Sequence, residues 1–321
     1  MPRRYFNWKL AIVLIISICV LGVTAVGLRQ WQRTHRADQG LILGNNAYDE
    51  QKWDEAAEYL GRYISIEETD VPVLMKYAEA QLKIRPRKRG NIALALEAYR
   101  RVLRADRSNS KAAMLLTKLY LDTIFAAGEA ELIASKYLDN NDDPEPELRE
   151  MLALAMARQR KFTEAATELK DIIQEHPDQI SAYELLGQLT EERPADFQDS
   201  PESWFDEAVK NNPDSALAYI ARAGFYQRNK NRSEALIDLV KAEGLVLSNS
   251  NSDPNDELRL AVEFINANIL EKAEEHLTYV QKVIPKNLSL WEAWAELAMK
   301  SRSQIKMQKI AETGLKELSY Q

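Results

Sequence analysis

A run of nineteen residues without a charged side chain lies near the start of the sequence and reads LAIVLIISICVLGVTAVGL over residues 10–28. A helix needs about twenty apolar residues to cross a bilayer. Amphipathic aromatic rings favour the membrane interface, and such residues flank the run on both sides: Tyr5, Phe6, Trp8 and Trp31. The pattern predicts a transmembrane helix over 10–28, after a short basic flank (1–9) and before a juxtamembrane linker (29–36).

Two other interpretations of this segment are open. A cleaved signal peptide would use the small residues of Val23–Ala25 or Ala25–Gly27 as its cleavage site. The apolar run is longer than a usual signal core, which favours retention as an anchor. A lipoprotein signal fits less well, because Ile18 stands before Cys19 where a small residue is expected.

The orientation of the anchor does not follow from charge counting, because three basic residues flank the run on each side. Long domains can be translocated largely regardless of charge. The N-terminal flank is as short as that of a signal-anchor. We therefore predict a single-pass membrane protein with its N-terminus inside and the rest on the outer, periplasmic or extracytoplasmic side.

Beyond residue 36, apolar positions recur with the three-to-four-residue spacing of amphipathic helices. Similar phrases read WDEAAEYL at 53–60, ALEAYRRVL at 95–103, EAATEL at 164–169 and EALIDL at 234–239. Abundant Ala, Leu, Glu and Lys favour helix. Recurrence of one helical phrase indicates a repeat architecture, so we predict an all-α array of helix pairs over residues 37–321.

Residues 146–179 resemble a tetratricopeptide repeat, whose period is about 34 residues. The resemblance is carried by Leu152, Ala153, Ala165, Leu169, Ile172 and Pro177. With more divergence at the N-terminal end, it extends over about eight units: 37–70, 71–109, 110–145, 146–179, 180–215, 216–253, 254–287 and 288–321. The second unit needs about five extra residues between its helices, and the third needs one.

The resemblance implies a right-handed α-solenoid, in which each pair packs only on its neighbours and the first helices line a concave surface. Small residues at positions 8 and 20 of a unit let its two helices approach closely. Two helix starts are also marked locally, because Ser200 and Asp253 each place a capping side chain before a proline.

Charge separates the N-terminal segment from the rest of the chain. Residues 37–321 hold 49 acidic and 36 basic side chains, whereas residues 1–36 hold six basic and no acidic ones. An acidic body argues against nucleic acid as a partner, since nucleic-acid binding needs a basic footprint. The single cysteine, Cys19, excludes an intramolecular disulfide and a cysteine-based metal site.

No candidate catalytic or metal constellation stands out. Asp139, Asn141, Asp143 and Glu150 have the spacing of a calcium-binding EF-hand loop. Pro144 occupies the position that requires a positive-φ glycine, which argues for an ordinary loop. His35, His176 and His276 are isolated, and no phosphate-binding loop or nucleophile motif is present. We expect no cofactor, no metal, no small-molecule substrate and no enzyme activity.

The resemblance implies that partners bind the concave face through positions 2, 5, 9 and 12 of each first helix. These candidate binding residues include Asn45, Tyr48, Lys111, Lys118, Glu184, Gln188 and Gln227. We predict a membrane-tethered scaffold that binds a protein or peptide partner. The alternative is that this chain is the anchor and scaffold portion of a longer protein whose C-terminal region carries an enzymatic or other activity.

Overall fold

The computed structural model of the chain describes residues 17, 24, 29, 34–86, 88–141, 144–249 and 252–318. Every regular element within these residues is a helix, which confirms the all-α prediction. None of the helices in this described part is both long and apolar enough to cross a membrane. The predicted transmembrane span at 10–28 lies outside the described residues except for Ser17 and Thr24, and it stays a prediction.

The chain divides into two compact units, the first ending at Leu116 and the second starting at Thr117. The first unit contains a helical stretch over residues 34–49, then α2 (Trp53–Ile64), α3 (Val71–Lys83), α4 (Arg89–Ala105) and most of α5 (Ser110–Leu119). The side chain of Asp70 accepts a hydrogen bond from the backbone N–H of Val73 and so caps α3. Arg101 of α4 donates to the carbonyl oxygens of Ile64 and Glu68, 2.7 Å away in each case, and ties the pairs together.

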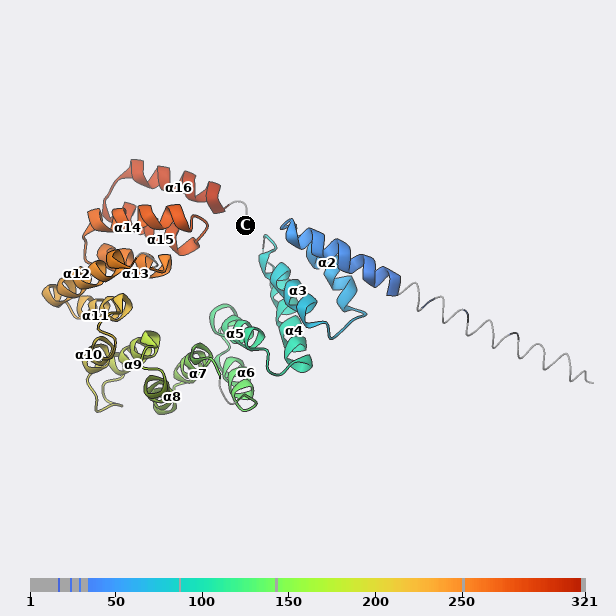
Figure 1. Cartoon of the computed structure of the whole chain (residues 1–321), viewed down its shortest axis with the longest axis horizontal. Helices are drawn as coiled ribbons and strands as arrows, with labels where there is room; N and C mark the ends of the chain where they lie inside the picture. The colour runs from blue at the N-terminus through green and yellow to red at the C-terminus, as the bar shows by residue number, and fades with distance from the viewer. Residues whose placement is uncertain are drawn as a thin grey trace, which may run out of the picture. The chain divides into compact units, whose positions relative to one another are not determined.

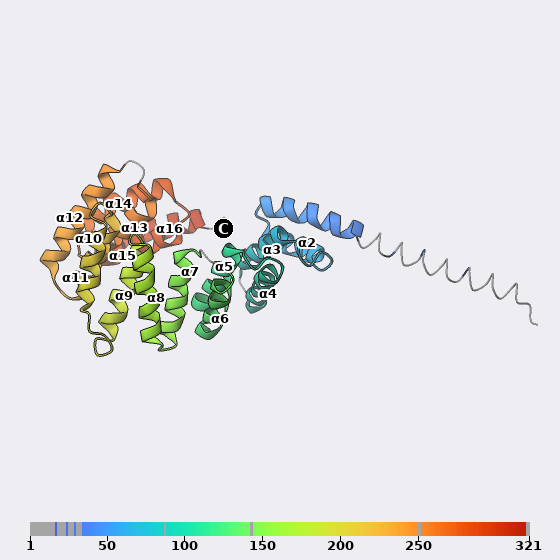
Figure 2. The same ribbon diagram turned by 60° about the horizontal axis from the view of Figure 1, so that its bottom comes forward.

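The second unit continues as a stack of short helices that follow one another in chain order (Figures 1 and 2). They are η1 (Tyr120–Ile124), α6 (Ala127–Leu138), α7 (Pro146–Arg158), α8 (Phe162–Glu175), α9 (Ile180–Glu192), α10 (Pro201–Asn211), α11 (Ala216–Arg228), α12 (Arg232–Ser248), α13 (Pro254–Asn266), α14 (Leu270–Val283), α15 (Leu288–Lys300) and α16 (Gln304–Leu318).

The two predicted capping side chains behave differently. Both helices start at the proline, because proline presets the backbone of the first turn and its missing N–H costs nothing there. Asp253 caps α13 by accepting from the backbone N–H of Asn255 at 2.8 Å. Ser200 makes no side-chain cap; only its carbonyl oxygen accepts, from the N–H of Ser203 at 3.1 Å.

Tight turns inside the helix pairs place a residue in the left-handed region at the same point. Each of these residues is the fifteenth of its predicted unit, with φ between 54° and 65°: Gln51, Arg160, Lys230, Asn268 and Arg302. The third predicted repeat (110–145) has one extra residue. Here a π-helical turn at Tyr120–Ile124 lengthens α5, and Phe125 takes the left-handed conformation instead, with φ 58°. A single π-turn, with its i→i+5 hydrogen bond, holds one more residue than an α-helical turn, so it can accommodate the extra residue.

The packing inside a pair depends on residues that lack a large side chain. A Cβ atom at Gly44 would come within 2.5 Å of Leu60 Cδ2, and one at Gly187 within 2.5 Å of Phe205 Cε2. Phe205 is buried and stacks on Phe225, with ring centroids 4.9 Å apart. Gly187 therefore lets α9 approach α10 closely enough to bury an aromatic ring between them.

Candidate partner-binding surfaces

In the first compact unit, two of the predicted residues, Asn45 and Tyr48, contact side chains of α3 in the next helix pair. We call Asn45, Tyr48, Lys76 and Glu79 the N-terminal polar face. The ammonium group of Lys76 donates to Asn45 Oδ1 at 2.6 Å and lies 5.2 Å from the centre of the Tyr48 ring. The Tyr48 hydroxyl donates to the carboxylate of Glu79. The face therefore joins the helical stretch 34–49 to α3 by pairing the neutral side chains of Asn45 and Tyr48 with the charged side chains of Lys76 and Glu79.

The electrostatics of the N-terminal polar face keep Glu79 ionised. Burial alone would raise the pKa of Glu79, but hydrogen bonds from Lys83 and Tyr48 outweigh it, so that the pKa lies below its ordinary value. Burial and the neighbouring Glu79 carboxylate raise the pKa of the Tyr48 hydroxyl. The hydroxyl therefore stays protonated and acts as a donor across the physiological pH range.

The two predicted lysines of α5 are both exposed. The charge of Lys111 contributes to the lowered pKa of Glu79, so it acts on the N-terminal polar face. Lys118 lies beyond the point where the first compact unit ends. No described contact joins Lys118 to the other predicted residues.

A second group lies in the second compact unit, on the first helices of three successive pairs. We define the C-terminal polar face by Glu184, Glu191, Gln227, Arg228, Arg259 and Glu263. Glu184 on α9 forms an ion pair with Arg259 on α13, with 2.5 Å between Oε1 and Nη2, and this contact passes over the intervening helix α11. Three helices of the stack therefore contribute to one continuous polar surface.

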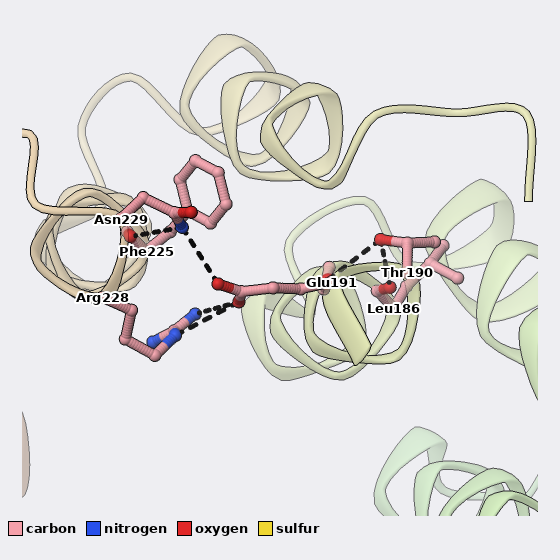
Figure 3. Close-up of polar contacts among 7 residues, drawn as sticks. Leu186, Thr190, Glu191, Phe225, Arg228 and Asn229 are labelled. Atoms are coloured by element: carbon pink, nitrogen blue, oxygen red, sulfur yellow. Dashed lines mark hydrogen bonds and ion pairs between the residues drawn. The ribbon is translucent and has the colours of Figure 1, made fainter. Parts of the chain in front are cut away.

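The contact between α9 and α11 is shown in Figure 3. One carboxylate oxygen of Glu191 accepts from Nε and Nη2 of Arg228 at 3.2 and 3.1 Å, and the other accepts from the Asn229 amide at 2.9 Å. The two donors approach from the end of α11 and hold the carboxylate from both sides. Such a charge-assisted pair has a defined geometry, which fixes the spacing of the two helices at this edge.

The contact between α11 and α13 is centred on Gln227 and Glu263. The amide nitrogen of Gln227 donates to Glu263 Oε2 at 3.0 Å and to the Glu263 backbone oxygen at 3.2 Å. Gly224 lies one turn earlier on α11, and a Cβ atom there would be 3.5 Å from both Glu263 Oε1 and Arg228 Nη1. A methyl group at this position would therefore touch both neighbouring side chains at ordinary contact distance.

Two carboxyls of the C-terminal polar face are strongly desolvated. Burial raises the pKa of Glu184, and the charges of Arg259 and Arg228 only partly offset this effect. Burial also raises the pKa of Glu263, with a further contribution from the nearby negative charge of Glu184. Ionised Glu184 and Glu263 are therefore held at a free-energy cost, which a cationic partner group would reduce.

The exposed side chain of Gln188 lies between Glu184 and Glu191 on one face of α9, because residues four and three apart share a helix face. It also borders a small hollow of about 90 Å³ between α7, α8 and α9, whose walls include Leu154 and Leu185. Of the seven predicted residues, Gln188 is the one on this face whose side chain is both exposed and outside the ion-pair network.

Of the residues with EF-hand spacing, Asp143 lies outside the described residues, and the structure shows the contacts of Glu150. That side chain accepts from Ser181 Oγ at 2.6 Å and from the Gln179 amide at 2.9 Å, so it faces α9. The described residues contain no group of three acidic, histidine or cysteine side chains placed to hold a metal ion. His276 is buried, with Nδ1 2.9 Å from Glu257 Oε1.

The seven named candidates leave out the residues that complete both faces. Glu79 and Glu191 stand at positions 9 and 12 of their predicted units, which the concave-position rule already covers, whereas the rule misses Lys76, Arg228, Arg259 and Glu263. Lys76 and Arg259 are both sixth residues of their predicted units, one residue after a position that was considered. A rule that admitted both neighbours of each concave position would have found them. It would not have paired Glu184 with Arg259, because the two are 75 residues apart.

Stacked helix pairs whose contacts run between chain neighbours define the class of α-helical repeat proteins. Within that class, a family model described as tetratricopeptide repeat matches residues 150–216. This match supports the predicted repeat family over that part of the chain. No curated protein sequence matches the chain.

Solved structures resemble the chain at low sequence identity. A tetratricopeptide repeat protein from Parabacteroides merdae is 16% identical and superposes with a TM-score of 0.50, covering 82% of this chain and 99% of that one. The protein MamA is 16% identical with a TM-score of 0.47, over 56% of this chain and 93% of that one. A thermophilic TPR protein from Thermus thermophilus is 18% identical with a TM-score of 0.42, over 59% of this chain and 99% of that one. The first of these likenesses shows a tetratricopeptide-type helical fold.

Proposed function

We propose that this protein is a membrane-tethered scaffold that binds a segment of another protein on the face formed by its first helices. The observation that supports this most strongly is the C-terminal polar face, where α9, α11 and α13 contribute to one surface through the Glu184–Arg259 and Gln227–Glu263 contacts. A surface shared by three stacked helices is longer than the reach of a small molecule. It suits an extended or helical segment of a protein.

The charge of this face indicates how a partner would be attracted. Three glutamates face two arginines, and the part of the chain beyond residue 36 is acidic. A partner segment with basic side chains would relieve the desolvated Glu184 and Glu263 and could displace the internal arginines. Charges of this kind increase the rate of association and its salt sensitivity more than they increase affinity.

Binding can be tested with a variant that leaves the ion-pair network intact. A partner is first captured from detergent-solubilised membranes and identified, and its affinity is then measured with the purified full chain. Gln188→Arg places a long cationic side chain on the face, and we expect it to weaken binding roughly five- to thirtyfold, about 1–2 kcal/mol. Tyr48→Ala tests the N-terminal polar face in the same way.

The matched control is Lys210→Glu, because Lys210 is an exposed residue of the second helix α10. It should leave the affinity unchanged within a factor of two. Binding that ignored Gln188→Arg and Tyr48→Ala, or that responded only to Lys210→Glu, would show that the first-helix face is not the binding surface.

The membrane tether is proposed from residues 10–28 of the sequence, with the N-terminus inside and the repeat domain outside. Washing membranes with alkaline carbonate should leave the full chain in the pellet. A protease added to intact spheroplasts should degrade the repeats if they lie on the outer side. Release of a mature form that starts near Val26 would indicate a cleaved signal peptide, and protection of the repeats would reverse the orientation.

A further inference from the structure

A groove in the second compact unit lies along its last helices, between α14 and α16. Its volume is about 370 Å³, and its floor is formed by Trp291 and Trp294 of α15. One wall consists of Glu274, Thr278 and Gln281 of α14, and the other of Lys306, Lys309, Ile310 and Thr313 of α16. The groove shares no lining residue with either polar face, and both of its walls belong to second helices of their pairs. These three helices lie together in Figure 1.

The floor of the groove is fixed in place by close packing. The Trp291 N–H donates to the carbonyl oxygen of Pro285 at 2.7 Å, which sets the orientation of the ring. A Cβ atom at Gly314 would lie 3.0 Å from Trp291 Cε3, so α16 rests directly on the indole. Trp294 is only 8% exposed, and its N–H has no hydrogen-bond partner within the described residues. An unpaired buried donor of this kind is destabilising.

The charge of the groove is opposite to that of the chain as a whole. Lys306 forms an ion pair with Glu274 at 2.6 Å across one end of the groove. Lys309 lines the groove one turn further along, and its ammonium group has no ion-pair or hydrogen-bond partner within the part of the chain that the structure describes. One positive charge is thus left over beside an aromatic floor, in a protein whose formal net charge is −7.

The polar side chains of the walls complement peptide groups. The hydroxyl of Thr278 donates to the Glu274 carbonyl oxygen at 2.7 Å, and that of Thr313 donates to the Lys309 carbonyl oxygen at 2.8 Å. Both hydroxyls therefore keep lone pairs that can accept from backbone N–H groups. The amide of Gln281 offers a donor and an acceptor side by side, which matches one peptide unit.

We propose that this groove is a second binding site, which takes a short peptide segment of another protein carrying an acidic side chain next to an apolar one. The carboxylate pairs with Lys309, and the apolar side chain lies on Trp294 and Ile310. The volume is near the lower end of ligand sites, about 300–1,000 Å³, so it accommodates a few side chains and not a folded domain. This proposal is independent of the proposed function of the first-helix face.

The proposal can be tested with the full chain in detergent micelles and an array of random twelve-residue peptides as the probe. Bound peptides should be enriched in Asp or Glu beside an aromatic or large aliphatic residue. The dissociation constant of the best peptide, followed by tryptophan fluorescence, should rise at least tenfold with Lys309→Glu. It should rise by a similar factor when the acidic residue of the peptide is replaced by its amide.

Two controls separate this site from the rest of the surface. Lys282→Glu makes the same charge change at an exposed residue of α14 that does not line the groove, and Gln188→Arg alters the first-helix face. Both should leave the constant unchanged within a factor of two. An array without bound peptides, without an acidic–apolar preference, or with the same binding after Lys309→Glu would overturn the proposal.

Discussion

The N-terminal and C-terminal polar faces are both formed by first helices of the pairs, but their contacts span different numbers of helices. In the N-terminal polar face, contacts join neighbouring first helices only, as in Lys76 with Asn45. In the C-terminal polar face, Glu184 reaches Arg259 across a whole intervening helix. The longer reach depends on the long side chain and the planar, multiply donating guanidinium group of Arg259.

This difference in reach has an electrostatic consequence. Glu79 receives hydrogen bonds from Lys83 and Tyr48, and these lower its pKa despite burial. Glu184 and Glu263 lie deeper between helices, where burial dominates and raises the pKa of each. One repeat geometry can therefore either stabilise a carboxylate or leave it partly uncompensated, depending on how many helices the network spans.

The largest expected effect on stability concerns an arginine ion pair that reaches into the core of the second compact unit. Asp238 of α12 is 2% exposed and accepts from Nε and Nη2 of Arg222, both at 2.8 Å. Asp238→Ala would leave a mostly buried guanidinium without its main partner, and we expect a loss of about 3–5 kcal/mol in the free energy of unfolding. Hydrogen exchange in α11 and α12 measures the loss locally.

The matched control is Asp206→Ala, which removes the second carboxylate that Arg222 contacts. Asp206 is about half exposed, so its removal should cost at most about 1 kcal/mol. Equal effects of the two variants would mean that burial does not set the strength of these pairs.

The same change, glycine to alanine at a close contact between two helices, can be made in each of the two compact units. Gly187→Ala places a methyl group 2.5 Å from the Phe205 ring, and Gly44→Ala places one 2.5 Å from Leu60 Cδ2 and 3.0 Å from the Leu60 backbone nitrogen. We expect each to reduce the free energy of unfolding by about 1–3 kcal/mol through overpacking. Chemical denaturation followed by circular dichroism measures both.

Gly128→Ala provides the control, because the nearest atom to a Cβ there is the flexible end of Gln159 at 3.5 Å. It should be neutral or stabilising. In the second unit, Phe205→Leu should restore part of the stability lost by Gly187→Ala, and the double-mutant cycle then gives the coupling between the two positions. A Gly187→Ala variant as stable as the parent chain would contradict the close approach of α9 and α10.

The helical content and many helix starts followed from the sequence because they are local. Proline and an acceptor side chain act within one turn, as Asp253 does for α13. Even so, Ser200 has the same sequence signal and makes no side-chain cap. Local signals therefore determined where helices start more reliably than how their ends are bonded.

The candidate binding residues were predicted less completely, for a physical reason. Helical periodicity tells which side of a helix Glu184 occupies, but the stacking of later pairs decides that Arg259 lies opposite it. Nothing local in the sequence marks Arg259 or Glu263 as members of the same surface. The π-turn before Phe125 is a similar case, because one extra residue can be absorbed in a helix or in a loop.

The opposite pKa directions in the two faces predict opposite responses to acid. A raised pKa contributes stability that is present below the ordinary value near 4.5 and is lost as pH rises through the folded-state value. As pH falls from 7 towards 4.5, protection against hydrogen exchange should therefore increase in α9 and α13. Glu79 has a lowered pKa, so its contribution to α3 persists to about pH 4.5 and is lost only below it.

Hydrogen exchange at several pH values, corrected for the intrinsic exchange rate, measures this difference helix by helix. Glu184→Gln should remove much of the response in α9 and leave that of α3 unchanged. A parallel decline of α3, α9 and α13 from pH 7 downwards would contradict the comparison of the two faces.

The smallest expected effect concerns Gly224 itself. Replacing a glycine inside a helix by alanine stabilises it by roughly 0.5–1 kcal/mol, because alanine loses less backbone entropy on folding. Gly244→Ala in α12 should give this gain in full, since no atom lies within 4 Å of a Cβ there. At Gly224 the new methyl group touches Glu263 and Arg228 at ordinary contact distance, so the gain should be similar and the Glu184–Arg259 pair should persist. Matched denaturation curves give the gain in the free energy of unfolding for each variant. The difference between the two gains measures the cost of placing a methyl group against the side chains of the C-terminal polar face. A net loss of stability for Gly224→Ala beside a gain for Gly244→Ala would show that the three-helix network requires glycine there, and not merely a small residue.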